Sequence, residues 1–172
     1  MDRYTSYINK SIEDLFNALE KRYLTMDMKR VREAYDWLVR AYKDQKRKTG
    51  EPCIVHPIAV AQIVAENFKL DANSVIAAFL HDVTEYTSYT FEDIRRCFGT
   101  DVGTLVALAA KRKKEKFDYS KADYFRQMLE AVQYNIRAIL IKLADNLHNM
   151  RTLANIEPDM QMKIVGESDF FY

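Results

Sequence analysis

The residues best suited to chemistry are the neighbours His81 and Asp82, followed three positions later by Glu85. A neutral imidazole together with a carboxylate suits a divalent ion such as Mn²⁺, Fe²⁺, Zn²⁺ or Co²⁺. On a helix, His81 and Glu85 would stand at i and i+4 and would share a face. Glu85 would then lie one turn from the metal, where it could move a proton from a water molecule held there. The pair alone predicts a metal site only weakly, because His-Asp occurs by chance in many proteins.

The other histidines strengthen this interpretation. The chain has 3 histidines, and each has a polar or charged neighbour at a helix end or at the border of an apolar stripe. A single histidine in such a position is more often an ordinary hydrogen-bonded side chain, but chance is harder to sustain for the set of His56, His81 and His148. Asp145, His148 and Asn149 stand at i, i+3 and i+4, so a helix would bring them to one face. Whether His148 supports a metal ligand or is only structural stays open at this point.

The composition is that of one ordinary globular domain. With 172 residues, 48% of them hydrophobic and 30% charged, the chain is long enough to bury a core. Its 4 Gly and 3 Pro indicate long helices with few tight turns, and a net charge of +1 gives no reason to expect nucleic acid or a membrane as a partner. There is no long apolar run and no secretory signal, so we expect a cytoplasmic protein. Cys53 and Cys97 form no paired motif and are expected to be small core residues.

Apolar residues recur at helical spacing along most of the chain, without the period-two alternation of strands. Helices are expected over residues 11–24, 28–45, 56–68, 72–84, 101–111, 120–133 and 136–153, with a short one between Thr90 and Gly99. Asp71 is placed to cap the helix over 72–84, and Thr90 with Asp93 resembles a capping box. The run 75–80 is apolar nearly all round, which is typical of a central, buried helix. We therefore predict an all-α fold, a single compact multi-helix bundle around one central helix.

We interpret residues 1–172 as one domain, in which 1–45 form an N-terminal helical pair and 46–172 carry the candidate metal and nucleotide site. The chain stops on three aromatic residues, Phe170–Tyr172, without a polar tail. This ending leads us to expect that the sequence is a fragment of a longer protein.

Several motifs together resemble one known family. The matching segments are Arg47–Pro52 with His56–Pro57, His81–Val83 with Glu85, Thr90–Gly99, Arg126–Leu129 and Ile141–Leu153. They span about Tyr42 to Tyr172, and the block from Lys142 to Leu153 is far more specific than the His-Asp pair. On these residues the chain resembles the hydrolase domain of the RelA/SpoT-type (p)ppGpp synthetase/hydrolase enzymes, within the HD-domain metal-dependent phosphohydrolases.

The resemblance implies a cofactor, a nucleotide site and a reaction. It implies Mn²⁺, with another divalent transition metal as the alternative, held by His56, His81, Asp82 and Asp145. It implies a nucleotide site built from Arg47, Lys48, Thr49, Asn149 and Thr152, with Glu85 as the catalytic carboxylate. The implied reaction removes the 3′-pyrophosphate of ppGpp or pppGpp and gives GDP or GTP plus pyrophosphate. A synthetase domain would accompany this domain in the full-length chain.

The chain departs from the family pattern at three positions. The family usually has Asp after Glu85, where this chain has Tyr86, and a phenol with a pKa of about 10 cannot replace a carboxylate as a base at neutral pH. Tyr124 replaces a common Asn, and Asn146 replaces an Arg. The intact ligand set favours a (p)ppGpp hydrolase whose rate is lowered by Tyr86. Two alternatives stay open: a degenerate metal- or nucleotide-binding regulatory domain, and a phosphohydrolase acting on another nucleotide.

Overall fold

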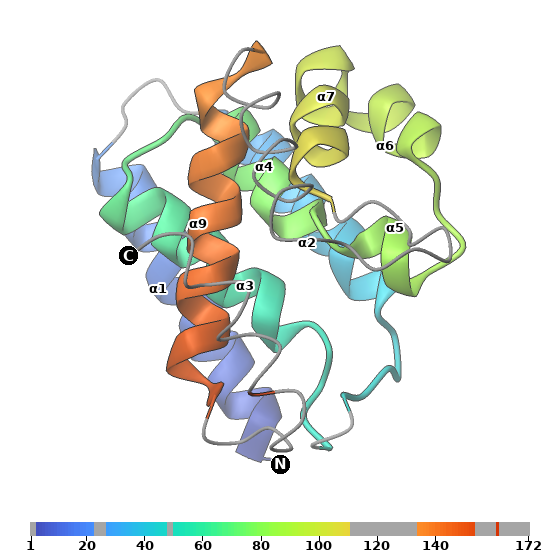
Figure 1. Cartoon of the computed structure of the whole chain (residues 1–172). Coiled ribbons are helices and arrows are strands. Elements are labelled where there is room, and N and C mark those ends of the chain that lie inside the picture. Colours follow the sequence, from blue (N-terminus) through green and yellow to red (C-terminus); the bar gives the residue numbers. More distant parts are fainter. Residues whose placement is uncertain (1–2, 23–26, 48–49, 111–133, 154–160, 162–172) are drawn as a thin grey trace.

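Helices surround one central helix in the computed structural model of the chain (Figure 1). The structure describes residues 3–22, 27–47, 50–110, 134–153 and 161. Within these ranges every named element is a helix, and an isolated antiparallel bridge pairs Lys46 with Pro52. The elements are α1 (Arg3–Arg22), α2 (Met28–Ala41), α3 (Val55–Gln62), the π-helix η1 (Ile63–Asn67), α4 (Ala72–Leu80), α5 (Val83–Tyr86), α6 (Phe91–Phe98), α7 (Thr100–Ala109) and α9 (Ile136–Arg151). The predicted all-α fold is confirmed.

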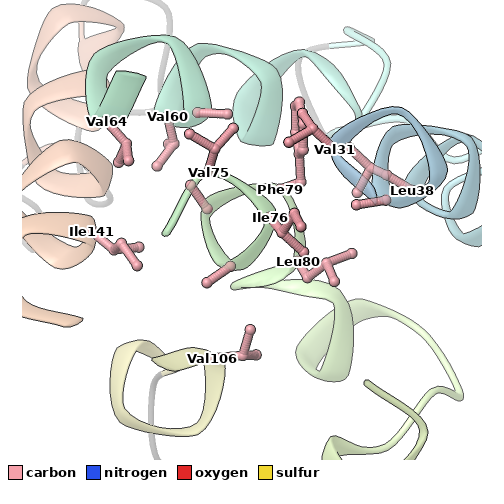
Figure 2. Packing of buried hydrophobic residues seen from close by; sticks show 14 of the residues in the cluster. Val31, Leu38, Val60, Val64, Val75, Ile76, Phe79, Leu80, Val106 and Ile141 are labelled. Atoms are coloured by element: carbon pink, nitrogen blue, oxygen red, sulfur yellow. The ribbon is translucent and has the colours of Figure 1, made fainter. Parts of the chain in front are cut away.

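The central helix is α4, as the apolar run predicted. Every residue from Ser74 to Leu80 is buried, and α4 packs against α2, α3, α7 and α9. Figure 2 shows its side chains, among them Val75 and Phe79, between residues of the surrounding helices. The Asp71 carboxylate caps the helix by accepting from the backbone N–H of Ser74 at 2.9 Å. A helix that is buried on all sides leaves its two ends as the places where polar groups can gather.

Some predicted boundaries are wrong. The helix expected over 72–84 ends at Leu80, and a separate short helix, α5, follows after His81 and Asp82. The helix expected over 56–68 is α-helical only to Gln62 and then widens into the π-helix η1. The Thr90–Asp93 capping box is present, with each side chain accepting from the other residue's backbone N–H. The helix expected over 120–133 lies outside the described residues, as do the resemblance segment Arg126–Leu129 and Tyr124.

The two cysteines differ in their surroundings. Cys53 is half-buried and packs against the core, whereas Cys97 is exposed on α6. The core prediction is therefore wrong for Cys97, because α6 turns Ile94 and Phe98 toward the protein and leaves Cys97 on its outer face. None of the described helices has both the length and the apolar character that a membrane span requires.

A polar network fixes the start of α9 against the starts of α4 and α7. The guanidinium of Arg137 donates to both carboxylate oxygens of Asp101, at 2.6 and 3.0 Å, and to Asp71 at 2.7 Å. Asn73 also donates to Asp101, at 2.7 Å. These donors favour the ionised carboxyl, and they hold the pKa of Asp101 below its usual value. The bidentate pair ties the first turn of α9 to α7, about two turns before Asp145 on the same helix.

This network predicts a pH-dependent contribution to stability. Because the pKa of Asp101 is lower in the folded state, its contribution is complete above the unfolded pKa of about 4 and is lost as pH falls through the folded value. We expect Asp101→Asn to lower the free energy of unfolding at pH 7 by about 0.5–1 kcal/mol, a modest figure because the carboxylate is partly exposed. Urea unfolding of both proteins from pH 7 to below pH 4 measures this. A gap between them that widens toward acid pH would contradict the account.

Candidate metal centre

Three helices meet where the predicted metal ligands lie. His56 is in the first turn of α3, His81 follows the last residue of α4, and Asp145 is on α9. Asp82 is the N-terminal neighbour of α5. Because α3, α4 and α9 all pack on one another, residues far apart in the sequence come together at this point.

Three of the four predicted ligands form a tight group, and Asp145 lies against it. His56 Nε2 is 3.1 Å from Asp145 Oδ1 and 3.4 Å from Asp82 Oδ2. His81 Nε2 is 3.3 Å from Asp82 Oδ2 and 3.9 Å from Asp145 Oδ1. Ligand atoms of His56, His81 and Asp82 all lie within 4.8 Å of one another, and Asp145 contacts this group through both imidazoles. The side chains are only 2–15% exposed, so the cluster is nearly dry.

The charges of the cluster are strongly coupled. Burial is the largest effect on His81 and opposes its imidazolium form, but Asp82, Asp145 and the Ala78 carbonyl together outweigh burial and raise the pKa of His81 to about 9. Burial likewise opposes ionisation of the two acids, yet the adjacent histidines lower the pKa of Asp145 to about 2 and hold that of Asp82 well below its usual range. Without a metal, a proton on His81 therefore offsets one of the two negative charges at neutral pH. A divalent cation would replace that proton, so metal binding should release it.

The ring of His81 is arranged as a metal ligand requires. Its Nδ1 lies 2.8 Å from the carbonyl oxygen of Ala78, which can only accept, so Nδ1 carries a hydrogen. Its Nε2 is buried and has no hydrogen-bond partner of suitable geometry among the residues that the structure describes. In the neutral ring this nitrogen presents a lone pair to two carboxylates, which is unfavourable unless a cation lies between them. The donor set of two imidazoles and two carboxylates therefore fits a divalent transition metal.

The third histidine also belongs to the centre. His148 is buried on α9, and its Nδ1 lies 2.8 Å from Nδ1 of His56. Burial, followed by the positive charges of His56 and Arg47, lowers the pKa of His148 to about 4, so its ring is neutral at pH 7. The sequence had placed His148 on the same face as Asp145 without showing that it contacts a predicted ligand.

Glu85 is placed differently from the prediction. His81 and Glu85 do not share a continuous helical face, because α4 ends at Leu80 and Glu85 belongs to α5. The helix is interrupted at Asp82, whose ψ of −5° departs from helical geometry. Glu85 is half-buried, and its backbone N–H donates to the carbonyl of Asp82 at 3.0 Å. The short α5, not the end of α4, thus fixes its position next to the centre.

Tyr42 is a neighbour of the centre, and the sequence marks it only as part of the apolar side of the helix predicted over 28–45. Its side chain is buried just after α2, and burial, followed by the negative charge of Asp82, raises the pKa of its hydroxyl. The charges of Cys53, Tyr86 and Glu85 raise this pKa further, so Tyr42 lies within electrostatic range of these residues. No local pattern marks Tyr42, because its spacing is that of an ordinary apolar stripe.

Two of the predicted nucleotide-binding residues lie at the end of α9, with Asn149 in its last turn and Thr152 directly after it. The Asn149 amide donates to Asp145 Oδ1 at 2.7 Å, so it contacts a predicted metal ligand directly. The Thr152 hydroxyl donates to the carbonyls of His148 and Asn149, at 3.0 and 3.2 Å. Both residues therefore lie at the same end of α9 as the metal cluster.

Arg47 reaches the centre from the loop before α3. The loop is closed by a hydrogen bond of 2.7 Å from the backbone N–H of Arg47 to the carbonyl of Glu51, and Gly50 supplies the turn with a φ of 81°. The guanidinium is 3.9 Å from the Glu51 carboxylate, and its charge acts on His148. Lys48 and Thr49 lie outside the described residues.

Comparisons with known proteins place the chain in a family. The profile of the HD domain family matches residues 34–172. The bifunctional (p)ppGpp synthase/hydrolase SpoT of Escherichia coli strain K12 is 46% identical over 156 residues, which are 88% of this chain and 22% of that protein. The GTP pyrophosphokinase of Streptomyces antibioticus is 38% identical over 155 residues, which are 90% of this chain and 18% of that protein. This chain therefore spans about a fifth of the length of these curated relatives.

A solved structure agrees with this placement. It belongs to a metazoan ortholog of SpoT that hydrolyzes ppGpp and plays a role in starvation responses, and it matches with a TM-score of 0.68 at 27% identity. The match covers 81% of this chain and 82% of the other. Because the profile extends over most of the sequence and includes all four predicted ligands, the chain belongs to the HD domain family and is homologous to the RelA/SpoT-type enzymes.

Proposed function

We propose that this domain is a metal-dependent phosphohydrolase that removes the 3′-pyrophosphate of ppGpp or pppGpp, giving pyrophosphate and GDP or GTP. The observation that carries the proposal is the buried cluster of two imidazoles and two carboxylates, in which His81 Nε2 has no hydrogen-bond partner among the described residues. The names of the relatives support the nucleotide, since SpoT of Escherichia coli is called a (p)ppGpp synthase/hydrolase.

The metal of the proposal is Mn²⁺, held by His56, His81, Asp82 and Asp145. When bound, such an ion supplies a water molecule of lowered pKa and a positive charge against a phosphoryl oxygen. The protein's own contribution is to keep two acids ionised in a nearly dry environment, where their attraction for a cation is strong.

Other side chains would position the substrate and move the proton. We assign Arg47, Lys48 and Thr49 to the phosphates, because a guanidinium binds phosphate oxygens in pairs and an ammonium adds a point charge. Asn149 and Thr152, beside the cluster on α9, are assigned to the nucleoside. Glu85 would accept a proton from the attacking water while the water oxygen forms its bond to phosphorus. The bond between phosphorus and the 3′ oxygen would break, and that oxygen would take up the proton held by Glu85 to become the 3′ hydroxyl.

One assay tests the proposal. The purified chain is incubated with Mn²⁺ and a panel of 3′- and 5′-phosphorylated guanine and adenine nucleotides, and the products are separated by ion exchange. Pyrophosphate release from ppGpp that stops with EDTA and returns with Mn²⁺ is the expected result. If only another nucleotide is hydrolysed, the assignment of ppGpp as the substrate would be wrong, while the assignment as a phosphohydrolase would stand.

Tyr86 favours a second candidate function, a regulatory domain that binds metal and nucleotide without turnover. It stands where the family usually has a second carboxylate, and one relative is named for the synthesis reaction, as a GTP pyrophosphokinase. In the same assay this candidate predicts tight binding of ppGpp, measured by equilibrium dialysis, with no release of pyrophosphate. The possible regulated partner would be a synthetase domain of the full-length protein.

A further inference from the structure

We propose that His148 is a positioning residue: by accepting a hydrogen bond from His56 Nδ1, it directs the lone pair of His56 Nε2 toward the metal site. The inference rests on the proposed metal site and assigns a role that the proposed function does not need. It concerns a residue that itself offers no ligand to the cluster.

The contact between the two rings is a hydrogen bond between like atoms. The nitrogens are 2.8 Å apart, and the ring centroids are 4.9 Å apart with planes at 56°, so the rings meet at their nitrogens and are not stacked. Two protonated nitrogens would repel at this distance, and two bare ones would leave both lone pairs facing each other. One proton must therefore lie between the rings, and one ring must accept.

The direction of this bond decides whether His56 can bind a metal. If His56 Nδ1 donates, its Nε2 is bare and can ligate the ion. If His148 donates, a neutral His56 carries its proton on Nε2 and can only donate to Asp145, 3.1 Å away. A ligand at this position requires the first arrangement, in which His148 is the acceptor.

The same design holds the other candidate histidine ligand. His81 Nδ1 is fixed by the carbonyl of Ala78, and that contact leaves its Nε2 facing the acids. His148 does for His56 what the backbone carbonyl does for His81. Because His148 stands three residues after Asp145, one turn of α9 supplies both a predicted ligand and the group that orients another.

A matched pair of substitutions isolates this role. Asn places its side-chain oxygen at the position of the histidine Nδ1, whereas Leu places a methyl group there. We expect His148→Leu to weaken Mn²⁺ binding about 10- to 100-fold, and His148→Asn to retain most of the affinity. Isothermal titration of the full chain with Mn²⁺ alone gives the affinities, independently of any substrate.

Two further measurements separate positioning from packing. Ile139→Val, a core change on α9 away from the cluster, should lower the free energy of unfolding by about 0.5–1.5 kcal/mol and leave Mn²⁺ affinity unchanged. In the Zn²⁺-loaded parent, long-range ¹⁵N spectra should show the proton of His56 on Nδ1.

The outcomes are distinct. Three results would each overturn the role of His148. The first is equal Mn²⁺ affinity in the parent and both variants, and the second is an equal loss of Mn²⁺ affinity in His148→Asn and His148→Leu. The third is a His56 proton on Nε2 in the Zn²⁺-loaded protein. Absence of metal binding by the parent would overturn the metal site itself, and the inference with it. Metal binding without any hydrolysis of ppGpp would overturn the proposed function and leave the role of His148 standing.

Discussion

The substitution Asp82→Asn is expected to weaken Mn²⁺ binding by at least about 100-fold and to reduce ppGpp hydrolysis to background. Loss of a residue that only supports a ligand typically costs about 10- to 100-fold in metal affinity, and this substitution removes the charge of a ligand itself. Asp82 Oδ2 lies 3.4 and 3.3 Å from the Nε2 atoms of His56 and His81, so a single oxygen of this acid is close to both imidazoles. Titration with Mn²⁺ and a pyrophosphate-release assay measure the two effects.

A control with the same chemical change is available within the chain. Asp101→Asn also replaces an ionised, hydrogen-bonded carboxylate by an amide, but it does so in the network with Arg137 at the start of α9. It should lower stability modestly and leave the Mn²⁺ affinity of the folded protein unchanged. Equal metal affinity in Asp82→Asn and the parent would show that the cluster is an ion-pair network and not a metal centre.

The proximity of the four predicted ligands could be expected from the sequence through the family resemblance. Imidazoles and carboxylates are the donors that a divalent ion needs, and His56, His81, Asp82 and Asp145 lie in motifs that resemble one family. The central position of α4 could likewise be predicted, because a helix that is apolar on all sides has no face to offer to water. The second prediction depends on local composition alone, whereas the first depends on the resemblance of several motifs to one family.

The break between α4 and α5 could not be predicted in this way. Val83 continues the apolar run after His81 and Asp82, so periodicity extends the helix past them, and Val83 is indeed buried. The break is set instead by contacts between distant parts of the chain. The His81 ring donates through Nδ1 to the carbonyl of Ala78, and its Nε2 lies near Asp145 on α9. Asp82 lies near His56 on α3. A tertiary constraint of this kind overrides the local pattern.

The partners of individual side chains were also beyond the sequence. Helical spacing placed His148 on one face with Asp145, but it could not show that His56, 92 positions earlier, would face it. Tyr42 illustrates the same limit, since its apolar spacing predicted burial correctly while its closeness to Asp82 depends on how α2 packs on α4. Spacing identifies the face of a helix, and only packing determines what that face meets.

The substitution Tyr86→Asp is expected to accelerate ppGpp hydrolysis by about 100-fold or more, because it adds the carboxylate that the family usually has next to Glu85. General acid–base groups typically contribute about 10²- to 10⁴-fold to a rate. Tyr86 is 59% exposed at the end of the short helix α5, so the change opens no cavity in the core and should alter stability little. Single-turnover kinetics with saturating Mn²⁺ would measure the chemical step directly.

The matched control for this gain is Tyr86→Asn, which has the shape of Asp without its charge. If the missing base limits the rate, the Tyr86→Asn variant should hydrolyse ppGpp at nearly the parent rate, whereas Tyr86→Asp should be faster. Adding Glu85→Gln to Tyr86→Asp should remove most of the gain, because the two carboxylates act together. Equal acceleration by Asn and Asp would mean that the Tyr86 ring only obstructs the substrate. No acceleration by either, in a protein that binds both metal and ppGpp, would favour the regulatory function, because the defect would then lie outside this position.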